Sequence, residues 1–214
     1  RRMMRLGIVL TILMGLMVIT ACNDPAADQP KATTGAPTQA SPQQPSVAGT
    51  KYVISPPNSK VEFIGSKVTG SHNGSFEKFA GVIDYAGSPD KSRVTVTMET
   101  DSITTDDPNL TKHLKTADFF DVAKFPQATF SSTEIAPGGA SGASHTITGN
   151  LTMHGVTKSV TFPATISVTP DAANVDANFS INRKDFGINY AGAQDNLIRD
   201  NVVLKLTIRA AKGT

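Results

Sequence analysis

Apolar and polar residues alternate along the chain from Lys51 onward, with a period of two. In the segment 92–103, Val94, Val96 and Met98 alternate with threonine and glutamate. Such a period places successive side chains on opposite faces of a β-strand, one apolar and one wet. The same pattern gives four further apolar faces: Ile147, Gly149, Leu151 and Met153; Val160, Phe162, Ala164, Ile166 and Val168; Val175, Ala177, Phe179 and Ile181; Val202, Leu204, Leu206, Ile208 and Ala210.

Clusters of turn-forming residues separate these segments. The stretches 86–92, 137–144 and 169–174 are rich in Gly, Pro, Ser and Asp and predict hairpin connections. Together with further strands near 51–54, 59–69, 75–85 and 127–136, the pattern predicts eight or nine strands, in a barrel or a sandwich. Pro163, inside one of the strand patterns, predicts an edge, a bulge or a strand break.

Two segments depart from the strand pattern. Asp106 or Asp107 followed by Pro108 resembles a helix start, and Leu110 and Leu114 would share one face, so a short helix is predicted from Pro108 to Thr116. The other segment, 183–201, is a long glycine-containing loop between two strands. Loops of this length in compact domains are often functional.

The first 21 residues predict a secretory signal peptide. Three arginines precede an uncharged run of 16 residues, from Leu6 to Ala21. That run is shorter than the roughly 20 residues of a spanning helix, and it ends in a small residue, as signal peptides do. Cys22 follows directly and is the chain's one cysteine. Residues 19–22, Ile-Thr-Ala-Cys, resemble the bacterial lipobox, in which the cysteine is acylated and becomes the first residue of the mature chain.

Residues 22–50 are then predicted to be the lipidated cysteine and a disordered tether. Residues 23–50 contain five prolines and one aliphatic residue larger than alanine, Val47. Such a segment buries too little apolar surface to offset its ordering entropy. A coil of this length would span about 30 Å. Without the three leader arginines, 17 basic residues face 18 acidic ones, so the charge gives no indication of nucleic-acid binding.

Catalytic constellations are absent from the sequence. The four histidines have no metal-ligand spacing, and no nucleophile elbow is present. A hydrolase using Asp118, Asp121 or His113 is the enzymatic alternative, but it lacks a supporting set of residues. The remaining signal is ten phenylalanines, four of them in the two irregular segments. An eight-stranded barrel can be filled by such side chains or can hold one small ligand.

Four runs resemble the YceI-like family of bacterial periplasmic proteins: SHNGSFEKFAGVIDY (71–85), HLKTADFFDVAKFPQATFSSTEI (113–135), ITGNLTMHGVTKSVTFPATI (147–166) and FSINRKDFGI (179–188). The resemblance covers nearly all of residues 51–210. It implies an all-β fold, an extended antiparallel eight-stranded lipocalin-like β-barrel with a short helix in one connection. It also implies an amphiphilic lipid ligand, a polyisoprenoid or an isoprenoid quinone. This agrees with the missing catalytic and metal-ligand sets, from which we expect no enzymatic activity, no metal and no other cofactor.

The expected organisation is therefore a signal peptide (1–21), a tether (22–50) and a lipid-binding domain (51–214) on a membrane facing the periplasm. Asn23 rather than Asp follows Cys22, which favours the outer membrane. A homodimer is possible. The alternative function is a structural or stress-response role in the envelope, with a barrel that is fully packed. The residues expected to contact the ligand are Phe63, Phe79, Val96, Met98, Leu114, Phe119, Phe120, Phe130, Leu151, Phe162, Phe179 and Phe186.

Overall fold

The computed structural model of the protein describes residues 24–38, 49–56 and 58–213. The predicted signal peptide, Cys22 and residues 39–48 of the predicted tether lie outside the described residues. No helix in the described ranges is long and apolar enough to span a membrane.

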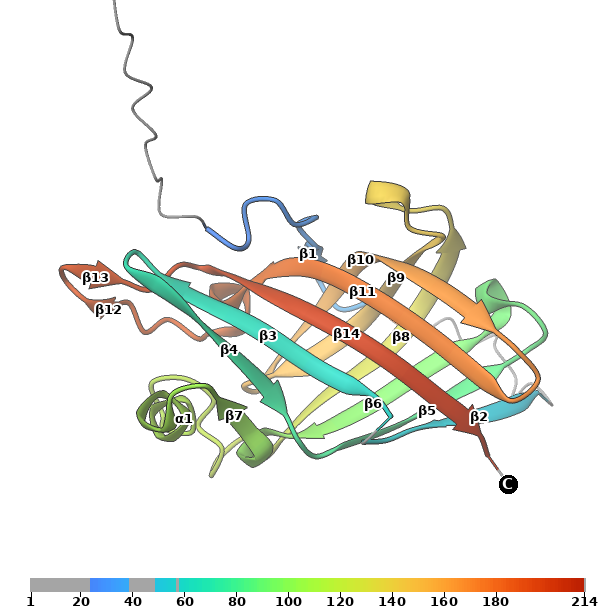
Figure 1. Ribbon diagram of the computed structural model, residues 1–214, viewed down its shortest axis with the longest axis horizontal. Helices are drawn as coiled ribbons and strands as arrows, with labels where there is room; N and C mark the ends of the chain where they lie inside the picture. Colours follow the sequence, from blue (N-terminus) through green and yellow to red (C-terminus); the bar gives the residue numbers. More distant parts are fainter. Residues whose placement is uncertain (1–23, 39–48, 57, 214) are drawn as a thin grey trace, which may run out of the picture.

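The central feature is a closed antiparallel barrel (Figure 1). Each strand pairs with the next around the ring, and the ring closes where Ala211 pairs with Val53. The predicted eight-stranded fold is thus confirmed. In ring order the strands are β2 (Thr50–Ile54), β5 (Phe79–Tyr85), β6 (Arg93–Glu99), β8 (Gln127–Pro137), β9 (His145–Met153), β10 (Val156–Val168), β11 (Ala172–Asn182) and β14 (Asn201–Lys212).

One end of the barrel carries additional elements, and we call this end the mouth. The edge of β14 that pairs with β2 also pairs, nearer the mouth, with β3 (Lys60–Lys67). Strand β3 pairs in turn with β4 (Gly70–Phe76), and β4 pairs with β7 (Ile103–Thr105). The helix α1 (Pro108–Leu114) and the small hairpin β12 (Gly192–Ala193) and β13 (Asn196–Leu197) lie at this end (Figure 1). The β5–β6 connection, with the 3₁₀ turn η1 (Pro89–Lys91), lies at the opposite end. The remaining 3₁₀ turns are η2 (Thr100–Ser102), η3 (Ala140–Gly142) and η4 (Arg183–Phe186).

Several local predictions are confirmed. The carboxylate of Asp107 caps α1 by accepting from the N–H groups of Asn109 and Leu110, and Pro108 is the first helical residue. The helix ends at Leu114 rather than Thr116. Pro163 causes neither a bulge nor a break: it pairs with Thr146 of β9 and has no opposite residue on its other side. It is therefore a local edge position.

The predicted strand 75–85 is instead two strands. It breaks between Phe76 and Phe79 because the chain changes partners there: β4 pairs with β3 and β7, whereas β5 pairs with β2 and β6. The adjacent polar residues Glu77 and Lys78 interrupt the alternation there, a signal that the strand prediction missed.

Phenylalanines form much of the barrel interior. Phe162 and Phe179 stack with their ring centroids 4.2 Å apart, and Phe130 lies 5.8 Å from Phe162. Gly149 faces the ring of Phe130, and a β-carbon at that position would overlap it. This close approach explains the glycine within an otherwise regular strand.

The prediction of a disordered tether is wrong for residues 24–38. Residues Thr33–Gly35 form β1, which pairs with β10 at Thr161, Val160 and Ser159. The pairing of β10 with β11 extends only from Thr165 to Val168, so the two strands diverge towards the mouth. Residues 30–35 fill this seam, since Ala32 donates to the carbonyl of Ser180 in β11.

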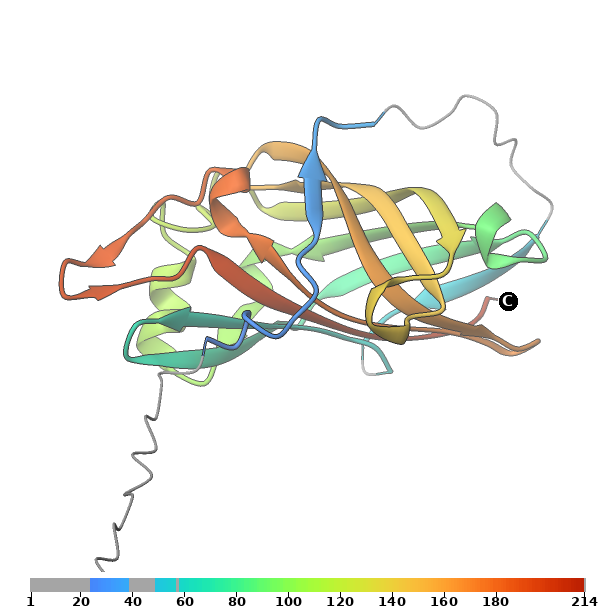
Figure 2. The ribbon, with the colours of Figure 1, turned by 90° about the horizontal axis from the view of Figure 1, so that it is seen from above.

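The same segment is packed as well as paired. Ala26 and Ala32 are buried, and so are the outward-facing Ser180 of β11 and Val203 of β14. Figure 2 shows the segment running along the barrel wall beside β10. Composition failed to predict this ordered segment, because a segment of small residues can be held by an existing barrel wall although it contributes little apolar surface of its own.

Candidate functional site

A cavity of about 440 Å³ occupies the barrel interior. Its wall follows β14 from Ile208 to Val202, about 20 Å at roughly 3.3 Å per residue. It then continues to Ile198 and Tyr190 at the mouth. A cavity of this volume lies within the range of small-molecule sites, roughly 300–1,000 Å³. The interior is therefore not the fully packed barrel of the structural alternative.

The lining is mainly aliphatic and aromatic. Phe63 contacts Phe76, which in turn makes an edge-on contact with Phe120 at 5.7 Å. The stacked pair of Phe162 and Phe179 lines the cavity too. Burial of a hydrocarbon chain against such surface contributes about 25 cal/mol per Å² of apolar area. The wall is thus suited to a long apolar chain.

Ten of the twelve predicted ligand contacts line this cavity, and their role in binding stays a prediction. They are Phe63, Val96, Met98, Leu114, Phe119, Phe120, Phe130, Leu151, Phe162 and Phe179.

Phe79 and Phe186 are the two exceptions. Both are buried in the core, but neither lines the cavity. Phe79 is the first residue of β5, where the chain leaves β4 and enters the ring. Phe186 ends η4, which packs against β10, and its carbonyl lies 3.3 Å from Nδ1 of His154. Phe186 therefore fills the space beneath the loop rather than the mouth of the cavity.

The segment 108–126 covers one side of the mouth. Leu114 and Phe119 are buried and Phe120 is half-buried, while Lys112 is exposed. Phe119 contacts the ring of Tyr190 at 5.3 Å, and His113 lies 5.0 Å from both rings. This aromatic cluster joins α1 to the loop 187–200 across the opening.

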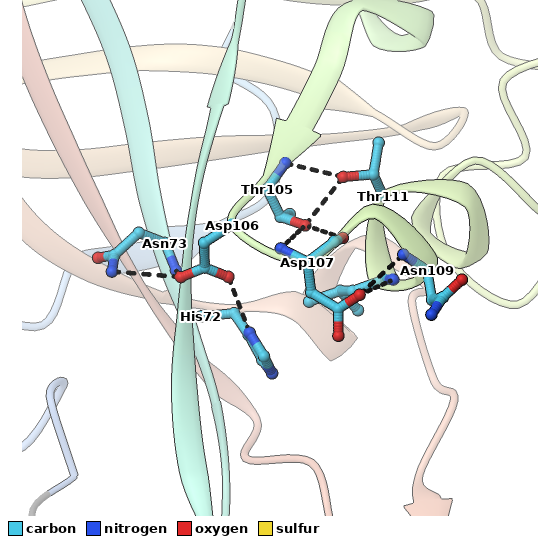
Figure 3. A network of polar contacts seen from close by, with 8 residues as sticks. His72, Asn73, Thr105, Asp106, Asp107, Asn109 and Thr111 are labelled. Atoms are coloured by element: carbon cyan, nitrogen blue, oxygen red, sulfur yellow. Dashed lines mark hydrogen bonds and ion pairs between the residues drawn. The ribbon is translucent and has the colours of Figure 1, made fainter.

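Polar groups gather where β4, β7 and α1 meet (Figure 3). His72, which lines the cavity, lies 2.8 Å from the carboxylate of Asp106 through its Nδ1. Asp106 also accepts from the main-chain N–H of Asn73 at 2.8 Å. That backbone hydrogen bond and the contact with His72 lower the pKa of Asp106 below its ordinary value.

The neighbouring threonines tie α1 to β7. Thr111 accepts from the N–H of Thr105 at 2.9 Å, and the hydroxyl of Thr105 donates to the carbonyl of Asp107 at 2.7 Å (Figure 3). These bonds and the cap at Asp107 fix the start of the helix at the edge of the cavity.

A buried arginine fixes the opposite side of the mouth. Arg183 donates to the carbonyls of Ile188, Ile198 and Arg199, at 2.7, 3.3 and 3.1 Å. Its Nη2 is 3.6 Å from Asp200. Burial lowers the pKa of Arg183, and Asp200 opposes that shift. The guanidinium is therefore a clamp that holds the two ends of loop 187–200 together.

The enzymatic candidates form only a pair. His113 Nε2 lies 2.8 Å from Asp118, at the surface beside the mouth. Among the hydrogen bonds of the described residues, the imidazole of His113 has no hydroxyl or thiol partner that could act as a nucleophile. Asp121 has a left-handed backbone, with φ of 44°, and its carbonyl accepts from Lys124 and Phe125, which makes it a turn residue. No cluster of possible metal ligands occurs within the described ranges.

Sequence reasoning missed part of the lining. Val202, Leu204, Leu206 and Ile208 were identified as one strand face, and the alternation would have placed them in the cavity. Tyr190 and Ile198 lie in an irregular loop, so no periodic signal marks them. Their position at the mouth follows from the clamp at Arg183.

A closed barrel with an apolar interior and polar groups at one end defines a lipocalin-like binding protein. The YceI-like domain model matches residues 52–210, and the chain belongs to this family. A UPF0312 protein of Pseudomonas putida strain GB-1 is 38% identical over 128 residues, 56% of this chain and 66% of the relative. Protein YceI of Salmonella arizonae is 40% identical over 122 residues, 54% of this chain and 62% of the relative. The matched region is thus somewhat under two thirds of these relatives.

Solved structures share the fold. Burkholderia cenocepacia BcnA matches with a TM-score of 0.63 and 26% identity, over 71% of this chain and 96% of that one. A polyisoprenoid binding domain from Saccharophagus degradans matches with a TM-score of 0.60 over 76% and 99% of the two chains. At 15% identity, the second likeness concerns the fold alone.

Proposed function

We propose that the protein binds a long amphiphilic lipid, a polyisoprenoid or an isoprenoid quinone, inside its barrel. The observation that carries this proposal is the elongated apolar cavity with polar groups at one end. An apolar chain would lie along β14, and a polar head would remain near His72 and Asp106. The Saccharophagus domain, described as polyisoprenoid binding, supports the same ligand class through its shared fold.

We further propose that the protein is a lipoprotein of the bacterial cell envelope, acylated at Cys22 and facing the periplasm. The support is the sequence alone: the basic and apolar leader and the lipobox-like residues 19–22. Carriage, storage or sequestration of the lipid would follow from such a location. Asn23 after the cysteine favours the outer membrane, and a homodimer stays a prediction.

Native mass spectrometry and solvent extraction of the protein purified from bacterial membranes test the lipid proposal. We expect one bound amphiphile per barrel in the protein without substitutions. Leu204→Trp would narrow the cavity and should reduce the bound lipid at least about tenfold, a cost of about 1.4 kcal/mol in binding.

Lys205→Trp provides the matched control. Lys205 is exposed on the outer face of the same strand, so this variant should keep its lipid. A natively folded protein without substitutions that yields no amphiphile would contradict the proposal. Equal amounts of bound lipid in the two tryptophan variants would also contradict it.

A further inference from the structure

The mouth carries an exposed apolar rim. Four large hydrophobic side chains are exposed among the described residues, and three of them, Val68, Tyr190 and Leu197, lie at this end. Their exposed fractions are 48%, 37% and 49%, and that of Val53, at the other end, is 44%. We call Val68, Tyr190 and Leu197 the mouth rim.

The mouth rim is held in place by hydrogen bonds between two hairpins. The N–H of Val68 donates to the carbonyl of Leu197 at 3.1 Å, and Thr69 donates to the side chain of Asn196 at 3.0 Å. Tyr190 is fixed against His113 and Phe119. The rim is therefore a preformed apolar surface around the opening of the cavity.

The N-terminal segment begins at the same end. Asp24 forms an ion pair with Arg199 at 3.3 Å, two residues after Leu197 in the chain. Residues 26–35 then pack against the wall and pair with β10 and β11. Cys22 is two residues before Asp24, at most about 7 Å of extended chain. If Cys22 is acylated as proposed, its acyl chains would attach close to the mouth, rather than at the end of a 30 Å tether.

We propose that the mouth rim docks on the lipid bilayer, so that the cavity opens towards the membrane. This inference rests on the proposed membrane attachment, since acyl chains on Cys22, or an apolar leader ending at Ala21, would enter the bilayer within a few residues of Asp24. Aliphatic and tyrosine side chains at such a surface suit the boundary between head groups and acyl chains. An amphiphile could then pass from bilayer to cavity with its chain shielded from water.

Charge does not provide an alternative driving force. Lys67, Lys184 and Arg199 near the mouth are accompanied by Asp195 and Asp200. Lys184 and Asp200 form an ion pair at 2.9 Å. Apolar insertion should therefore hold the mouth at the bilayer with little dependence on salt.

A spin label at Leu197→Cys tests the orientation in the full chain, purified from membranes and reconstituted in vesicles of phosphatidylethanolamine and phosphatidylglycerol. We expect the label to be relaxed several-fold more by membrane-soluble oxygen than by a water-soluble nickel complex, with little change at high salt. Val53→Cys, equally exposed at the opposite end, should show the reverse. Unchanged thermal melting of both variants checks that each one folds.

Two results separate the possible failures. An acylated Cys22 has no free thiol, so one label per chain supports the attachment, while two labels per chain contradict the attachment. If attachment holds and the Leu197 label is as accessible to nickel as the Val53 label, the docking proposal is overturned. Protection of Leu197 without vesicles, rising with protein concentration, would instead show self-association and also overturn it.

Discussion

At the scale of single residues, Arg183 illustrates how one side chain organises the mouth. Its guanidinium satisfies three carbonyls and balances Asp200 in a position that excludes most solvent. The sequence places this arginine at the start of the long loop, but its role could not be predicted. The carbonyls that it binds are five to sixteen residues away and adjacent only in the folded chain.

Arg183→Ala should destabilise the fold by about 2–3 kcal/mol, because buried carbonyls lose charged donors. Hydrogen exchange should increase first in residues 187–200, and thermal unfolding would give the total loss. Lys184→Ala is the matched control, since Lys184 is half-exposed and pairs with the surface carboxylate of Asp200. Equal effects of the two substitutions would show that Arg183 is not a clamp.

The lowered pKa of Asp106 predicts that local stability around this residue depends on pH. Because its pKa is lowered in the folded state, its contribution is fully present above the ordinary value of 3.8 and is lost as pH falls through the lowered value. The residue is largely exposed, so the loss should stay well under about 1 kcal/mol. Amide exchange of Asn73 and the start of α1, followed from neutral pH to pH 3, measures this loss.

Asp106→Asn should remove this part of the acid sensitivity. Asp90, whose pKa is lowered mainly by the nearby hydroxyl of Ser88, would still titrate in the variant. If exchange around Asn73 has the same pH profile in both proteins, Asp106 does not provide the effect.

At the scale of elements, regular strands were predictable and departures from regularity were not. Alternation identified the inner faces of β6, β9, β10, β11 and β14 because each of these strands has one wet and one buried side. The capped helix was also predictable, since Asp107 and Pro108 act locally. The element β1 was not, because its apolar content is low and its stability depends on a seam formed by distant strands.

We expect different effects from replacing the two adjacent phenylalanines that follow α1. Phe119→Ala should lower stability by about 3–5 kcal/mol, because it removes a buried ring that joins α1 to Tyr190. Phe120→Ala should cost less, since Phe120 is half-buried, but it opens the cavity beside Phe76 and should reduce lipid retention. Thermal melting and extracted lipid distinguish these effects. Neutral results in both assays for both variants would contradict a covering role.

At the scale of the whole molecule, the barrel combines a continuous wall with an incompletely filled interior. Ligand binding to the folded state alone stabilises a protein by about 2.7 kcal/mol at a hundredfold excess over Kd. Delipidation should therefore lower the melting temperature by about 5–10 °C in a domain of this size. Differential scanning calorimetry before and after extraction measures this shift. With its lipid affinity reduced at least about tenfold, Leu204→Trp should show about half this shift or less, and an equal shift in that variant would indicate damage from extraction.

The seam strand has a consequence for the order of folding. Residues 33–35 pair with residues 159–161, so this contact spans most of the chain. Closing so long a loop is entropically unfavourable until β10 and β11 are in place. The N-terminal segment is synthesised early, yet it can dock only after the barrel has assembled. If the mouth docks on the bilayer as proposed, each molecule would acquire that orientation as the last step of its folding.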